Sequence, residues 1–130
     1  MEKGQLILCD TNIVIELYKG NPAIQKTLKS IGQENITVSI ITAGELIYGA
    51  LNKRELARIK KDIAHLQTLG IDDAVCDKFL TLMSTYALSH QLSLPDGFIA
   101  ATALAHQIPL YSLNKKDFKY IKGLKLYEAG

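Results

Sequence analysis

Acidic residues stand at the starts of several predicted helices, and two of them follow apolar runs that are typical of buried strands. Asp10 comes directly after QLILC, Glu45 comes shortly after NITVSII, and Asp96 opens the Ala-rich stretch LPDGFIAATALA. A carboxylate at the end of a buried strand costs free energy unless something neutralises it. Carboxylates packed together without basic partners raise one another's pKa, and a divalent cation removes that cost. These positions therefore point to metal chemistry.

A fourth junction adds further oxygen ligands. Asn114 and Asp117 lie in SLNKKDF, just after the apolar run LYSL. In open parallel sheets, ligands bind outside the carboxyl ends of the strands, so these junctions are expected to converge on one pocket. Oxygen ligands without a cluster of His or Cys favour Mg²⁺ or Mn²⁺ over zinc. We expect one acidic pocket that binds such a cation.

Each acid also has a simpler interpretation, because a single Asp or Glu at a helix start is most often a cap or a dipole partner. Thr42 stands three residues before Glu45, which matches a capping box and would place Glu45 in the first turn of its helix. The recurrence of the pattern, and the position of Asp10 at a strand end, favour the metal site. The acids outside this context are expected to be surface or capping residues: Asp62, Asp72, Asp73 and Asp77.

The elements that must position these side chains alternate between strand and helix patterns, which predicts an α/β fold with a parallel sheet. Repeats, low-complexity segments and linkers are not evident, so residues 1–130 are expected to form a single domain. Strands are predicted at residues 5–9, 35–41, 110–113 and, at the C-terminal end, 124–127. Helices are predicted at residues 11–19, 22–31, around Glu45, and at 53–69, 73–91 and 95–108.

Composition narrows the class of protein. Lys and Arg number 15 against 13 Asp and Glu, so the overall charge does not favour an acidic or a basic partner. Cys9 and Cys76 lack a CxxC pattern, and we expect both to be buried, reduced thiols. The sequence shows neither a signal peptide nor an apolar run long enough to cross a membrane. We expect a soluble, cytoplasmic protein.

Four segments, taken in order, resemble the PIN domain, and specifically the VapC-type toxin ribonucleases. They are LILCDTNIVIE, ITAGELIYGA, LPDGFIAATALA and YSLNKKDF, and the similarity extends from about residue 6 to the C-terminus. The resemblance implies a three-layer α/β/α sandwich with a central parallel sheet. It also implies a Mg²⁺- or Mn²⁺-dependent endoribonuclease that is usually a homodimer and is neutralised by a cognate VapB-type antitoxin.

The resemblance assigns roles to individual residues. Asp10, Glu45 and Asp96 match the three acids of the family's site, and Asn114 with Asp117 matches its fourth position. In this family the acids bind metal, and water attacks the RNA phosphodiester. Thr11 and Ser112 match hydroxyl positions that orient water or phosphate, and capping is an equally good account of both. We therefore expect the catalytic residues to be Asp10, Glu45, Asp96 and Asp117, with Asn114 as a further metal ligand.

RNA must also be held against an acidic pocket that repels its backbone. The candidate counter-charges are Arg54, Arg58, Lys115, Lys116 and Lys119. Lysines at this density are ordinary solvated surface in most proteins, so the sequence leaves both interpretations open. The three histidines, His65, His90 and His106, lack metal-ligand spacing and are expected to be structural or surface residues.

Apolar residues on helices in the first half exceed what one core needs. Ile15 with Tyr18, and Tyr48 with Leu51, are candidates for cover by an antitoxin segment or by a dimer partner. Burial in the domain's own core is the alternative for each of these residues.

Other functions fit less well. A haloacid-dehalogenase-like phosphatase needs a second Asp two residues after its nucleophile, and this chain has Asn12 there. A receiver domain needs paired acids early in the chain and a phosphorylated Asp on the third strand. A non-catalytic PIN domain that binds RNA as a scaffold would usually have lost acids, and here the three main acids are present.

Overall fold

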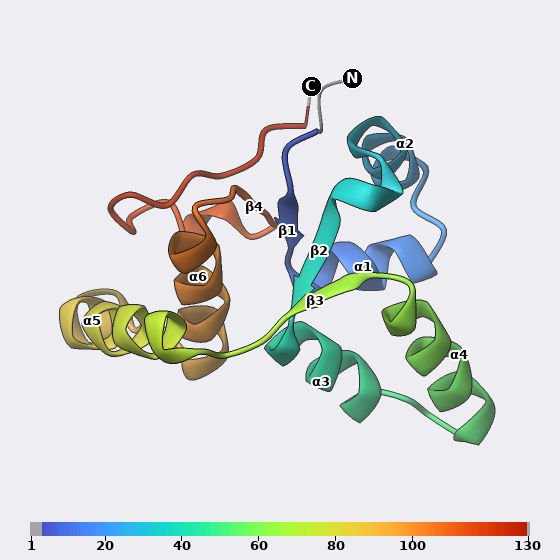
Figure 1. Cartoon of the computed structure of the whole chain (residues 1–130), viewed down its shortest axis with the longest axis horizontal. Coiled ribbons are helices and arrows are strands. Elements are labelled where there is room, and N and C mark those ends of the chain that lie inside the picture. Colours follow the sequence, from blue (N-terminus) through green and yellow to red (C-terminus); the bar gives the residue numbers. More distant parts are fainter. Residues whose placement is uncertain (1–3, 130) are drawn as a thin grey trace.

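Four short parallel strands form the centre of the molecule (Figure 1). The structure is a computed structural model and describes residues 4–129. Their order in the sheet is β3-β2-β1-β4. Leu8 of β1 pairs with Thr37 of β2 on one side and with Leu110 of β4 on the other. The strands are β1 (Ile7–Cys9), β2 (Ile36–Ser39), β3 (Gln67–Leu69) and β4 (Leu110–Tyr111).

Six α-helices connect the strands and cover both faces of the sheet. In Figure 1, α5 and α6 lie on one side of the strands, while α1, α2 and α4 lie on the other. The helices are α1 (Thr11–Tyr18), α2 (Pro22–Ile31), α3 (Ile40–Tyr48), α4 (Lys53–Ala64), α5 (Asp73–His90) and α6 (Leu94–His106), with short 3₁₀ turns η1 (Gln33–Asn35) and η2 (Lys115–Asp117). The predicted three-layer α/β/α architecture is confirmed.

Alternation along β1 explains the two cores. Leu8 points into the cluster that includes Val75 and Leu82 of α5 and Ile99 of α6. Its neighbours Ile7 and Cys9 point into the opposite cluster, with Ile13 of α1, Ile24 of α2 and Ile59 of α4. Successive side chains of a strand face opposite sides of the sheet, so an uninterrupted apolar run such as ILC is what a doubly covered strand requires. β1 is the central element on which both layers are built.

One strand of the structure was not predicted, and one predicted strand is almost absent. The periodicity of residues 53–69 predicts one helix, whereas α4 ends at Ala64 and β3 follows at Gln67–Leu69. The predicted strand at 124–127 is reduced to an isolated bridge between Leu126 and Leu110. In both places a very short pairing is decided by contacts with distant strands, which local periodicity does not register.

The cysteine prediction is half wrong. Both thiols are free, but only Cys9 is buried, and Cys76 is exposed on α5. Burial, followed by the nearby Asp10 charge, raises the pKa of the Cys9 thiol to about 12. Cys76 lies in the first turn of a long helix. None of the helices in residues 4–129 is long and apolar enough to cross a membrane.

Tight packing between α5 and α6 fixes the start of α6. The rings of Phe79 and Phe98 stack with centroids 3.7 Å apart. Gly97 lies against α5 so closely that a Cβ atom there would stand 2.9 Å from Sδ of Met83. Because only a glycine permits this approach, Asp96 in the preceding position is held in a defined place at the helix start.

Candidate active site

Asp10 is the most deeply held acid of the predicted set. It caps α1, with Oδ1 accepting a hydrogen bond from the backbone N–H of Thr11 at 2.8 Å. Its other oxygen, Oδ2, accepts from Oγ of Ser112 at 2.8 Å, and the residue is only 6% exposed. Burial raises the pKa of Asp10, and the charges of Glu45 and Asp117 raise it further, while the two hydrogen bonds lower it. Asp10 therefore serves as a cap, as the simpler interpretation has it, and is also coupled to other acids.

Ser112 ties the end of β4 to the start of α1. While it donates to Asp10, its Oγ accepts from the backbone N–H of Asn114 at 3.0 Å and from Nδ2 of Asn12 at 3.3 Å. Oδ1 of Asn12 in turn accepts from the backbone N–H of Leu113 at 3.2 Å. Asn12 is a structural residue of the site that the sequence did not single out. Its signal is its position two residues after Asp10, at the first turn of α1.

Glu45 lies in the second turn of α3, so the predicted capping box is wrong. Ser39 caps α3 by accepting from the backbone N–H of Thr42 at 3.0 Å, and the helix starts at Ile40. The helix begins earlier than predicted because the chain turns as soon as β2 ends. Glu45 is exposed, and its Oε1 accepts from Oγ1 of Thr11 at 2.7 Å. The capping alternative for Glu45 is removed, and its carboxylate is turned toward the start of α1.

Asp96 lies in the first turn of α6. Its backbone N–H donates to Oγ of Ser93, the helix cap, at 3.2 Å. Burial raises the pKa of Asp96 to about 6, and the charges of Asp10, Asp117 and Glu45 add to the effect. A carboxyl group whose pKa lies this far above its usual value is characteristic of functional sites, where a cation or a proton compensates for crowding.

The fourth position is shared by Asn114, which precedes η2, and Asp117, the last residue of η2. The backbone carbonyl of Asn114 accepts from the N–H of Asp117 at 3.0 Å, and the side chains of both residues are exposed. The charge of Asp117 raises the pKa of both Asp10 and Asp96. Asn114 is anchored through its backbone to Ser112.

The structure thus brings together the side chains of four distant segments. The ion pairs in residues 4–129 are Lys19 with Glu16 and Lys115 with Glu128, and neither neutralises Asp10, Glu45, Asp96 or Asp117. Within the same described residues, no group of three or more Asp, Glu, His or Cys side chains is arranged so that it could hold a metal ion. Mg²⁺ is usually held through one or two carboxylates together with waters and substrate phosphates, so a site of this kind does not need three protein ligands. The all-oxygen donor set and the raised pKa values fit this kind of cation.

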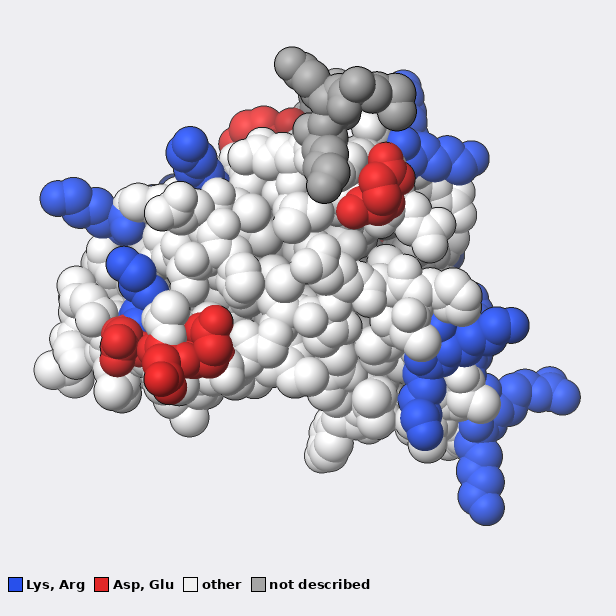
Figure 2. Space-filling view, viewed as in Figure 1, with Lys and Arg blue, Asp and Glu red and all other residues white. Residues whose placement is uncertain are grey.

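The basic candidates lie in two separate places. Lys and Arg side chains gather over α4, while acidic side chains gather at the start of α5 (Figure 2). Arg58 of α4 lies over the ring of Tyr18, 5.0 Å from its centroid, and Arg54 is exposed on the same helix. Lys115, Lys116 and Lys119 are exposed in or beside η2, next to Asp117 along the chain, and Lys115 pairs with Glu128. Of the two groups, the one at η2 lies beside an acid of the predicted site along the chain.

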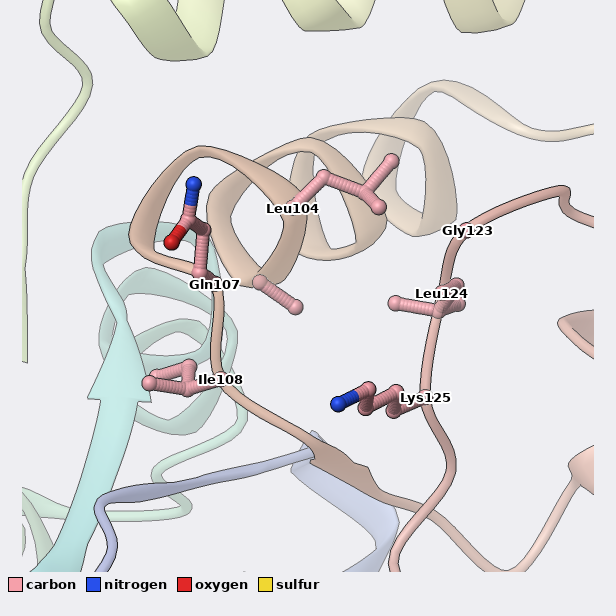
Figure 3. Close-up of a pocket in the computed structure, with 7 residues that line it drawn as sticks. Leu104, Gln107, Ile108, Gly123, Leu124 and Lys125 are labelled. Carbon is pink, nitrogen blue, oxygen red and sulfur yellow. The ribbon is translucent and has the colours of Figure 1, made fainter.

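One hollow on the surface of residues 4–129 borders the acids. That hollow, of about 560 Å³, is lined by Thr11, Glu45 and apolar residues of α1 and α3 that include Ile15 and Tyr48. A groove of about 870 Å³ runs between α1, α2 and α4. A small pocket of about 270 Å³ separates the end of α6 from residues 123–125 (Figure 3).

The histidines occupy helix ends, as expected for structural or surface residues. His90 and His106 are the last residues of α5 and α6. His65 follows α4, and its Nδ1 pairs with the backbone carbonyl of Lys61 at 2.8 Å. A cationic side chain at a helix C-terminus complements the helix dipole.

Comparison with known proteins identifies the family. The family model described as the PIN domain matches residues 7–124. The chain is 31% identical over 127 residues to "Ribonuclease VapC1" of Methanocaldococcus jannaschii, covering 94% of this chain and 87% of that protein. It is 28% identical to "tRNA(fMet)-specific endonuclease VapC" of Shigella flexneri, covering 91% and 93% of the two chains.

Among solved structures, the chain is similar to one in a toxin-antitoxin complex from Klebsiella pneumoniae. The TM-score is 0.78 at 30% identity, over 94% of this chain and 98% of that one. A chain in the DNA-bound VapBC of Salmonella typhimurium superposes with a TM-score of 0.84 at 22% identity, over 97% and 99%, which supports the fold alone. On the strength of the family model and these relatives, the chain belongs to the PIN-domain family.

Proposed function

We propose that this protein is a divalent-metal-dependent endoribonuclease and the toxin of a VapBC-type toxin-antitoxin pair. The observation that carries the proposal is the convergence of Asp10, Glu45, Asp96 and Asp117, which come from four separate segments. The charges of Glu45 and Asp117 raise the pKa of both Asp10 and Asp96, and no ion pair neutralises these acids in the part of the chain that the structure describes. The relatives named as VapC ribonucleases support the reaction class and the choice of RNA. The retained acids favour a catalytic protein over an RNA-binding scaffold.

The cofactor in this proposal is Mg²⁺ or Mn²⁺. Asp10 and Asp96 would hold the cation, and Glu45, Asp117 and Asn114 would complete its surroundings or bind a second ion. Such a cation lowers the pKa of water and neutralises the charge that builds on the phosphoryl oxygens during hydrolysis. The raised pKa values of Asp10 and Asp96 reflect crowding that the cation would relieve.

The protein's own groups then perform the remaining tasks. Ser112 and the backbone of Thr11 hold the two oxygens of Asp10, so that carboxylate has a fixed orientation. Glu45 is exposed and its carboxylate is held by the Thr11 hydroxyl, so it would accept a proton from the attacking water. Lys116 and Lys119, which have no part in the Lys115–Glu128 ion pair, would attract the RNA backbone toward the acids.

The partners and the setting form part of the same proposal. Relatives occur in toxin-antitoxin complexes, and we propose a VapB-type antitoxin and a second copy of this chain as partners. Tyr48 and Leu51, at the end of α3 and just beyond it, are 93% and 85% exposed and provide apolar surface for one of them. We further propose that the 130 residues act as one domain in the cytoplasm.

A cleavage assay tests the function. Purified protein is incubated with single-stranded RNA in Mg²⁺, in Mn²⁺ and in EDTA, beside the variants Asp10→Asn and Asp77→Asn. We expect cleavage with either metal, no cleavage in EDTA, and a loss of at least about 100-fold in Asp10→Asn, because a removed charge-stabilising group costs on that order. Asp77 is an exposed acid of α5 and serves as the matched control. Equal cleavage by all three proteins, or RNA binding without cleavage under every metal, would contradict the proposal.

A further inference from the structure

A chain of hydroxyl groups stands behind the carboxylate of Glu45. Oγ1 of Thr11 donates to Oε1 of Glu45 at 2.7 Å and lies 3.0 Å from Oγ1 of Thr42. Oγ of Ser39 lies 3.4 Å from Oγ1 of Thr42. These hydrogen bonds link Ser39 at the end of β2 to Thr42 in α3, then to Thr11 at the start of α1, and finally to Glu45 in α3.

The direction of the chain follows from counting protons. An ionised carboxylate accepts and cannot donate, so Thr11 must give its one hydroxyl proton to Glu45. The contact between Thr11 and Thr42 then requires Thr42 to be the donor, and Ser39 donates to Thr42 in turn. The Ser39 oxygen is itself fixed, because it accepts from the backbone N–H of Thr42 at 3.0 Å. Each hydroxyl proton therefore has a single acceptor, and the negative charge on Glu45 sets the donor and the acceptor in every bond of the series.

The Thr42 hydroxyl bonds to residues outside the regular turns of its helix. Ser84, Thr85 and Thr102 each donate to the carbonyl four residues earlier in their own helix. Thr42 is the third residue of α3, and the residue four positions before it belongs to β2, so this local bond is not offered by its own helix. The hydrogen bonds of the Thr42 hydroxyl within residues 4–129 are those to Thr11 and Ser39. Ser39 and Thr42 are both 0% exposed, so neither side chain can touch a substrate. Their hydroxyl groups therefore bond to each other, and that of Thr42 also bonds to Thr11, the residue that holds Glu45.

We propose that Thr42 is a positioning residue that acts through Thr11 to hold the Glu45 carboxylate in its reactive orientation, with Ser39 fixing Thr42. The mechanical reason is that Glu45 is exposed, and an exposed carboxylate samples several rotamers unless a partner selects one. Thr11 is that partner, and Thr42 prevents the Thr11 hydroxyl from rotating away. The catalytic meaning of this arrangement rests on the proposed function, but the orientation of Glu45 does not.

Kinetics provide the first test. Thr42→Val keeps the shape of the side chain and removes the hydroxyl, Thr42→Ser keeps the hydroxyl, and Thr102→Val makes the same exchange at another buried helical threonine. We expect kcat for RNA cleavage to fall at least about 10-fold in Thr42→Val with KM unchanged, since misplacing a reacting group by about 1 Å costs up to about 100-fold. Thr42→Ser should restore most of the rate, and Thr102→Val should match the wild type.

A second test reads the orientation directly, without cleavage. In NMR spectra of the unmodified protein, we expect slowly exchanging hydroxyl protons on Thr11 and Thr42, with the Thr42 proton close to the Thr11 oxygen. Glu45→Ala should release the Thr11 proton to fast exchange and leave the backbone signals of α3 in place. A Thr42 proton that is bonded to its own helix carbonyl, or a folded Thr42→Val variant with wild-type kcat, would overturn the proposal. If no protein cleaves RNA but the NMR result holds, the proposed function has failed and the positioning role of Thr42 stands.

Discussion

At the scale of single residues, the site is an arrangement in which acids repel one another and hydroxyl groups hold them in place. Asp10 keeps a charge at a strand end because two donors, Ser112 Oγ and the N–H of Thr11, are aimed at its two oxygens. Asp96 donates its backbone N–H to Oγ of Ser93 at the helix cap, and the charges of the neighbouring acids raise the pKa of its carboxyl group. This difference leads to a prediction about pH.

The stability of the metal-free protein should fall as the pH rises through about 6. The pKa of Asp96 is raised from 3.8 to about 6 in the folded protein, so the folded state holds this proton more tightly than the unfolded state does. Protonation of Asp96 therefore contributes fully to the free energy of unfolding below pH 3.8, and this contribution is lost as the pH rises through about 6. Thermal unfolding in EDTA across this range measures it.

The variant Asp96→Asn isolates this effect from the other acids. Because Asn cannot ionise, the melting temperature of the variant should rise relative to that of the wild type as the pH increases from 4 to 7. Mn²⁺ at pH 7 should raise the melting temperature of the wild type more than that of the variant. Parallel curves of melting temperature against pH for the two proteins would show that the pKa of Asp96 is not raised in the folded protein.

The acids, and the hydroxyl positions Thr11 and Ser112 beside them, could be identified from the sequence, but three of the residues that support them could not. Asp10, Glu45 and Asp96 can be found because each follows a local pattern of strand, turn and helix. Asn12, Ser39 and Thr42 cannot, because their role is defined by bonds to Ser112 and Thr11 that only the folded chain creates. Thr42 was assigned to a local capping box, and the structure gives that capping role to Ser39.

At the scale of elements, junctions determine where the acids lie. α1 and α3 start directly after β1 and β2, and η2 follows β4 after a short link, so Asp10, Glu45 and Asp117 come to one edge of the sheet. The order of helices was predictable because their apolar periodicity is long and clear. β3 was not predictable, since its three residues continue the pattern of α4 and become a strand only by pairing with β2.

Two glycines in these helices should respond oppositely to alanine. A Cβ on Gly44 of α3 would meet nothing within 4 Å, so Gly44→Ala should stabilise the protein by about 0.5–1 kcal/mol through helix propensity. A Cβ on Gly97 of α6 would stand 2.9 Å from Met83 Sδ and 3.2 Å from the Phe79 ring. Overpacking of this kind costs about 1–3 kcal/mol.

Urea unfolding of the two variants measures this difference. Gly97→Ala should be less stable than Gly44→Ala by at least about 1 kcal/mol, because the helix-propensity gain is common to both and the clash is not. Equal stabilisation of both variants would mean that α5 and α6 separate easily. In that case the packing would not fix Asp96 as described.

At the scale of the whole molecule, the surface carries more apolar area than a solitary domain needs. Tyr48 and Leu51 at the end of α3 are 93% and 85% exposed, and Leu88 of α5 is 99% exposed. Large exposed apolar side chains that cluster on a surface mark sites of protein contact. Ile15, predicted with Tyr18 to be covered by a partner or buried in the core, is 42% exposed. Tyr18 is partly buried, and its hydroxyl donates to Oδ2 of Asp62 at 2.8 Å, so only Ile15 remains a candidate for cover by a partner.

The proposed dimer can be tested by sedimentation. We expect the wild type to sediment with twice the chain mass of 14.4 kDa. The double variant Tyr48→Glu/Leu51→Glu should sediment as a monomer, because two charges in an apolar contact are costly to bury. Lys60→Glu places the same charge on the exposed face of α4 and should leave the dimer intact. A monodisperse wild-type monomer would remove the dimer from this account.

Calorimetric titration with Mn²⁺ tests whether acids from four segments form one divalent-cation site. We expect saturable binding to the wild type that is lost in Asp10→Asn and Asp96→Asn and retained in Asp77→Asn, with all four proteins folded. Binding of equal strength to all four proteins, or to none of them, would show that these acids do not form such a site.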